Sequence, residues 1–197
     1  MKKAILLGDS IREWYTLNVA EELKGKVEVI WQPGDNGRFA AYSYAQLSGL
    51  LKEHGKVDIV HFNTGYWDMN TVPFLNENVF PTDEYTYYLR KIIRLSRAAG
   101  AKVVFATTTP LPGKVQAKDN TGTDVDFSFE DDLVLKYNEA ALELMKEENV
   151  PVNDLYAICK KHENYYKCED NLHHSAEGNA VLGMAVADFI LKELGME

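Results

Sequence analysis

The chain has 197 residues, a length that suits one domain and leaves little room for a second one of full size. Its hydrophobic fraction of 46% and charged fraction of 26% are typical of a folded globular protein and exclude a disordered or collagen-like chain. The net charge of −9 argues against nucleic-acid binding and against attraction to an anionic membrane.

Short apolar runs alternate along the chain with longer segments that have helical periodicity. The runs predicted to form strands are residues 4–7, 27–31, 57–62, 101–106 and 150–152. The segments predicted to form helices are residues 11–23, 39–54, 82–99, 130–148 and 175–194. Strands that alternate with helices of this length indicate βαβ units with right-handed crossovers. We therefore expect one domain over residues 1–197, an α/β fold in which a doubly wound parallel sheet of about five strands is the middle layer of an α/β/α sandwich.

Two connections, residues 64–80 and 108–129, are longer than the few residues usual between such elements. Each follows the carboxyl end of a predicted strand, where ligands bind in open parallel sheets. We expect these segments to form walls or lids of a site.

Cellular location is predicted from what the chain lacks. No apolar run reaches the roughly 18 residues of a transmembrane helix. The apolar run at residues 4–7 is shorter than the roughly 7–15 residues of a signal-peptide core. Two cysteines, Cys159 and Cys168, do not make a disulfide framework. We expect a cytoplasmic protein that binds neither membranes nor nucleic acid; the sequence does not predict its oligomeric state.

The first predicted strand ends in Gly8-Asp9-Ser10, which places Ser10 at the start of a helix. A hydroxyl there lies near free backbone N–H groups and the positive end of the helix dipole, a favourable place for a developing oxyanion. The same position suits a serine that only caps the helix. Neither a GxGxxG turn nor a Walker lysine is present, so a phosphate-binding loop is excluded.

Before the last predicted helix stands Asp170-Asn171-Leu172-His173-His174. A carboxylate three residues before a histidine can fix the tautomer of its ring and stabilise the imidazolium, as a serine nucleophile requires. His174 is the alternative base. Of the other histidines, His61 lies inside a strand and is expected to be a core residue.

Together these two segments resemble the SGNH (GDSL-type) hydrolase superfamily, and the likeness extends from the first strand to the last helix. The second block of that family supplies a glycine N–H, and Gly37 of Asn36-Gly37 matches it. The third block, usually Gly-x-Asn-Asp, appears at residues 65–68 with Trp67 in place of the asparagine. Residues 61–65 are similar to a branch of the superfamily that carries an asparagine two positions before the glycine, here Asn63.

The resemblance implies a flavodoxin-like fold and roles for individual residues. Ser10 is the implied nucleophile, His173 the base and then the acid, and Asp170 the residue that orients His173. The N–H groups of Ser10 and Gly37 are the implied oxyanion donors, and Asn63, with Trp67 as the alternative, is expected to be the third. No cofactor is implied, and no metal-ligand spacing is visible.

Aromatic residues are frequent in the chain, and most are expected to be packing residues. Tyr66 and Trp67 follow a strand that leads to the expected site, so we expect them to contact the substrate.

The function that we expect is a serine esterase for small acyl esters, with O-acetyl groups on a carbohydrate as the finer hypothesis. The alternatives are a non-catalytic carbohydrate-binding module that keeps the fold, and a thioesterase or lysophospholipase.

Overall fold

The computed structural model describes residues 1–72, 75–118 and 126–196. Its main sheet is parallel and has the strand order β2-β1-β3-β6-β9. The strands are β1 (Lys2–Gly8), β2 (Val27–Ile30), β3 (Ile59–Asn63), β6 (Lys102–Ala106) and β9 (Val152–Asn153). The predicted α/β sandwich on a five-stranded, doubly wound parallel sheet is thereby confirmed.

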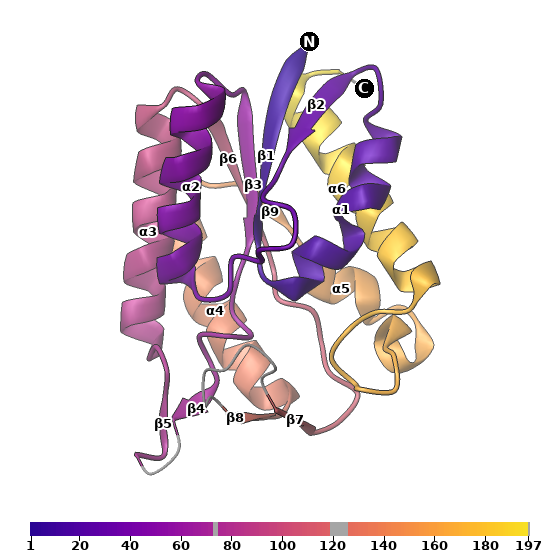
Figure 1. Cartoon of the computed structure of the whole chain (residues 1–197). Helices are drawn as coiled ribbons and strands as arrows, with labels where there is room; N and C mark the ends of the chain where they lie inside the picture. Colours follow the sequence, from indigo (N-terminus) through magenta and orange to yellow (C-terminus); the bar gives the residue numbers. More distant parts are fainter. Residues whose placement is uncertain (73–74, 119–125, 197) are drawn as a thin grey trace.

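Helices cover both faces of this sheet (Figure 1). Helices α1 (Ser10–Glu22) and α6 (Ala176–Leu194) pack against each other on one face. The other face carries α2 (Ala40–His54), α3 (Thr82–Ala98) and α4 (Asp131–Glu147). Because helices lie on both sides, the central strands are apolar without alternation, and residues 4–7 of β1 are fully buried. No described helix is both long and apolar enough to cross a bilayer.

The two long connections form a second, small sheet that the sequence pattern did not predict. Its antiparallel order is β5-β4-β8-β7, made of β4 (Thr71–Val72), β5 (Glu77–Asn78), β7 (Val115–Lys118) and β8 (Asp126–Phe129). It lies beyond the carboxyl ends of the parallel strands (Figure 1). Strands of two to four residues are too short to show an alternating pattern. Parts of the expected site walls, residues 73–74 and 119–125, lie outside the described residues.

A short helix, α5 (Leu155–Cys159), and a 3-10 turn, η1 (Glu163–Tyr166), were not predicted either. They lead from β9 into a loop over residues 167–174 and then into α6. Residues 167–174, here called the Asp-His loop, return the chain to the carboxyl edge of the sheet at α1 (Figure 1).

Candidate active site

The site begins where β1 ends beside β3. Gly8 has φ +146°, and a Cβ atom there would collide with the backbone and side-chain oxygens of Asn63. Gly8 is the register partner of Asn63, so the two strand ends lie next to each other. This is the switch point of the sheet, because β1 is flanked by β2 on one side and by β3 on the other.

Ser10, His173 and Asp170 form one chain of hydrogen bonds. Ser10 Oγ lies 2.9 Å from His173 Nε2, and His173 Nδ1 lies 2.6 Å from Asp170 Oδ2. Since the carboxylate can only accept, Nδ1 carries the ring proton and Nε2 is left to accept the serine hydroxyl. The structure therefore brings together the three residues predicted to be the triad, from positions that are 163 residues apart in the chain.

Asp170 is held as a carboxylate by its local contacts. Its Oδ1 accepts the backbone N–H groups of Leu172 and His173, both at 2.9 Å. Burial by itself would raise the pKa of Asp170, but the hydrogen bonds from the His173 ring and from the two backbone N–H groups bring it below the ordinary value.

The Asp-His loop is closed by main-chain contacts and crossed by Lys167. Lys167 and His174 form a β-bridge, and the Cys168 N–H donates to the His173 carbonyl at 2.8 Å. Lys167 Nζ then reaches across the loop to the Leu172 carbonyl at 2.8 Å.

The same ammonium ties the Asp-His loop to the rest of the site. Lys167 Nζ donates to Thr109 Oγ1, beyond β6, at 3.1 Å, and lies 3.4 Å from the Tyr66 hydroxyl, beyond β3. Burial lowers the pKa of Lys167 to about 7. Nothing in the sequence signals this role, because only the tertiary structure brings the three segments together.

At the end of β3, Asn63 joins two buried polar groups. Its Oδ1 accepts the Tyr15 hydroxyl at 2.7 Å, and its Nδ2 lies 3.3 Å from Asp9 Oδ1. Asp9 caps α1 by accepting the Ile11 N–H at 3.0 Å. Burial raises the pKa of Asp9 to about 6.

The expected oxyanion donors have different surroundings. Ser10 is the first residue of α1, and N–H groups of a first turn have no acceptor within the helix. The Gly37 N–H, expected to face the oxyanion, donates instead to the Gly8 carbonyl at 2.5 Å. That carbonyl also lies 3.3 Å from Nη2 of Arg12, so the Gly37 loop is tied to the end of β1.

Tyr66 and Trp67, expected to contact substrate, are both buried. The Tyr66 hydroxyl donates to the Thr109 carbonyl at 2.5 Å, and its ring stacks on Phe129 at 5.6 Å. The Trp67 ring packs edge-on against Phe39 at 5.4 Å. Tyr66 therefore packs on the small sheet, and Trp67 packs on the residue that precedes α2. Neither ring forms an exposed wall.

Two other histidines, His174 and His61, are buried and have hydrogen-bond contacts to residues other than Ser10. His174 is buried with Nε2 3.6 Å from Cys159 Sγ, and burial lowers its pKa to about 2. His61 is buried in β3, 3.3 Å from Asn153 Nδ2, and burial lowers its pKa to about 3. Both rings are neutral at physiological pH. Within the described ranges no group of His, Cys, Asp and Glu could hold a metal ion.

The sequence analysis also missed Trp14, whose ring stacks on His173 at 4.5 Å. A signal was available, because Trp14 stands four residues after Ser10 in a predicted helix and such residues share a face.

Solved structures match this architecture over nearly the whole chain. A lipase/acylhydrolase from Enterococcus faecalis has a TM-score of 0.73 and 20% identity, and the match covers 98% of this chain and 97% of that one. The chain has the SGNH hydrolase fold.

Two further structures with this fold are ester hydrolases by description. The M. smegmatis aryl esterase is 16% identical with a TM-score of 0.74, and 98% of this chain and 99% of that chain are covered. A carbohydrate acetylesterase family member from Sinorhizobium meliloti is 17% identical with a TM-score of 0.74, and the match covers 99% of this chain and 100% of that chain. No protein-family model and no curated protein matches the sequence.

Proposed function

We propose that this protein is a serine hydrolase of small acyl esters. The observation that carries the proposal is the unbroken hydrogen-bond chain from Ser10 Oγ through the His173 ring to the Asp170 carboxylate. A serine that only caps a helix has no need of an oriented imidazole. The proposal is supported by the fold, which is shared with acylhydrolases and esterases.

In the acylation step, Ser10 Oγ attacks the acyl carbon while His173 Nε2 takes the hydroxyl proton. The imidazolium that forms is stabilised by the carboxylate of Asp170. The same Nε2–H then protonates the leaving alcohol, and water completes the cycle by attacking the acyl-serine with His173 again as base.

We propose two N–H groups as donors to the tetrahedral oxyanion. The first is the backbone N–H of Ser10, at the positive end of α1. The second is the Asn63 amide, since Tyr15 holds its Oδ1 and thereby turns Nδ2 toward the Asp9-Ser10 turn. One of the two Nδ2 protons faces Asp9, and the other remains for the oxyanion.

For the substrate we propose acetyl esters, with acetyl groups on carbohydrate as the natural class. This finer assignment is supported by the carbohydrate acetylesterase of the same fold. It is a hypothesis about the alcohol, separate from the proposal that Ser10 is the nucleophile.

A series of p-nitrophenyl esters from acetate to laurate tests the reaction and sizes the acyl site. We expect turnover that falls with chain length and that Ser10→Ala abolishes. In parallel, a fluorophosphonate probe should label the parent protein on Ser10, as mapped by mass spectrometry. The matched control is Ser175→Ala, because Ser175 also stands before a helix but caps it by accepting the Gly178 N–H. Labelling that survives Ser10→Ala would contradict Ser10 as the nucleophile. An absence of turnover on every ester would contradict the proposal and favour a binding module.

A further inference from the structure

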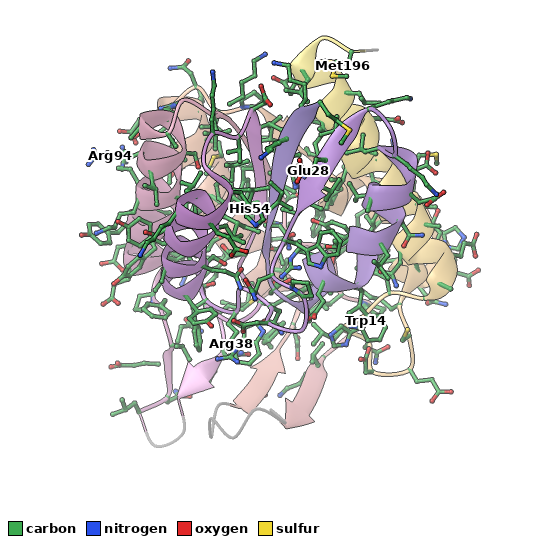
Figure 2. All side chains as sticks on the ribbon, turned by 45° about the horizontal axis from the view of Figure 1, so that its top comes forward. Trp14, Glu28, Arg38, His54, Arg94 and Met196 are labelled. Atoms are coloured by element: carbon green, nitrogen blue, oxygen red, sulfur yellow. The ribbon has the colours of Figure 1, made fainter. Side chains whose placement is uncertain are left out.

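Trp14 lies directly against the imidazole of the triad. Its ring and the His173 ring are stacked, with centroids 4.5 Å apart and an angle of 15° between their planes. Figure 2 shows Trp14 at the start of α1, beside the loop that leads into α6. It is placed one helical turn after Ser10, so nucleophile and indole share one face of the helix.

Core packing does not account for an indole at this position. The Trp14 side chain is 47% exposed and is not among the residues of the hydrophobic core, whereas its neighbour Tyr15 is fully buried within that core. Exposing so large an apolar ring brings no gain in folding free energy. The contact that the structure gives this ring is the stacking on the His173 imidazole.

We propose that Trp14 is a positioning residue that holds the His173 ring in line between Asp170 and Ser10. This inference rests on the proposed esterase function. Asp170 fixes the imidazole only at Nδ1, so the ring can still tilt about that hydrogen bond. The indole covers one face of the imidazole and opposes the tilt, which keeps Nε2 on Ser10 Oγ.

The contact strengthens when the imidazole becomes charged. A cation over the face of a tryptophan ring is attracted by its quadrupole at centroid distances up to about 6 Å. In the catalytic cycle the imidazolium forms when His173 takes the serine proton, so Trp14 stabilises the charged intermediate more than the state with a neutral imidazole. A contribution of this kind belongs to kcat rather than to substrate binding.

The leaving group offers a readout that a merely structural role would not change. Ethoxide must receive the proton of the imidazolium as it leaves, whereas p-nitrophenolate leaves without one. Loss of Trp14 should therefore damage the hydrolysis of ethyl acetate more than that of p-nitrophenyl acetate.

The experiment measures kcat and KM separately on both esters for the parent protein, Trp14→Ala and Trp14→Phe. Leu17→Ala is the matched control, because Leu17 is 70% exposed on the same helix. We expect Trp14→Ala to lose roughly 10-fold on ethyl acetate and less than about 3-fold on p-nitrophenyl acetate. Trp14→Phe should recover most of the loss, and Leu17→Ala should change neither rate. Melting temperatures should stay close to that of the parent.

Equal losses on the two esters, or no recovery with phenylalanine, would overturn the proposal. So would a change confined to KM on the aryl ester, which would make Trp14 a wall of the alcohol site. A proton NMR readout separates this inference from the esterase proposal. The signal of the His173 Nδ1 proton should broaden in Trp14→Ala and persist in Leu17→Ala even if no ester is turned over. A signal unchanged in Trp14→Ala would refute positioning by Trp14.

Discussion

The hydroxyl of Tyr15 donates a 2.7 Å hydrogen bond to Oδ1 of Asn63, 48 residues further along the chain. Burial raises the pKa of Tyr15 well above its ordinary value, so this hydroxyl keeps its proton and acts as a fixed donor. The bond decides which end of the amide faces Asp9, because an amide has one accepting and one donating end.

Asn63→Ala should lower kcat by about 10²–10³-fold with little change in KM, as expected for loss of an oxyanion donor. Tyr15→Phe should cost roughly 10-fold, since the amide remains but is no longer held. Trp67→Phe, which removes the indole N–H and keeps an aromatic ring, should retain most activity. Steady-state kinetics on p-nitrophenyl acetate measure all three. If Trp67→Phe takes the large loss instead, the side-chain donor to the oxyanion is Trp67 and not Asn63.

The two adjacent histidines should differ sharply in their effect on turnover. His173→Ala should reduce kcat by several orders of magnitude, because the members of a triad act as a unit. His174 contacts Cys159 and not Ser10, so His174→Ala should lower stability and leave most of the activity. Asp170→Asn should fold normally and turn over poorly, since an amide favours the wrong tautomer of the ring.

Circular dichroism of these three variants separates folding from catalysis. Equal losses of kcat in His173→Ala and His174→Ala, with both proteins folded, would contradict the assignment of His173 as the base from its contact with Ser10.

Lys167→Met should misplace the Asp-His loop. The substitution removes the hydrogen bonds to the Leu172 carbonyl and to Thr109 Oγ1 and keeps a side chain of similar length. We expect kcat to fall on the order of 10-fold, because small displacements of a catalytic group are costly, while KM stays nearly constant. Lys160→Met is the control, since Lys160 is exposed and donates only to the Tyr165 hydroxyl among its described hydrogen bonds. An effect on KM alone would place Lys167 in substrate binding instead.

Acid should destabilise the protein through its buried histidines. Burial lowers the pKa of His61 to about 3 and that of His174 to about 2, whereas both titrate near 6.5 in the unfolded chain. Below about pH 6.5 the unfolded chain therefore binds protons that the folded protein does not, and the free energy of unfolding falls as pH falls. Each group contributes up to about 1.4 kcal/mol per pH unit in this range.

Urea unfolding between about pH 7 and 4 measures this slope. Asp9 works against it between about pH 4 and 6, since burial raises its pKa to about 6, so the comparison of variants is decisive. His61→Gln should flatten the slope relative to the parent, and His162→Gln, at an exposed position, should not. Identical slopes in parent and His61→Gln would show that His61 titrates normally.

The sequence by itself determined the layers of the fold and predicted the three residues, Ser10, His173 and Asp170, that the structure joins by hydrogen bonds. Apolar runs such as residues 4–7 reveal buried strands because period and composition are local properties. Ser10 and Asp170-x-x-His173 could be paired because each segment has its own local signature, one at a strand-to-helix turn and one before the last helix.

Only the tertiary structure decided how each side chain uses its hydrogen bonds. The position of Gly37 in the sequence predicted that its N–H is an oxyanion donor. In the structure this N–H donates to the carbonyl of Gly8, 29 residues away in the chain. Trp67 looked like a site wall and is buried, while Trp14 is the exposed ring on His173. A sequence specifies which groups can donate, accept or stack, but which partner they meet depends on segments brought together at the edge of the sheet, and those contacts have no local pattern to read.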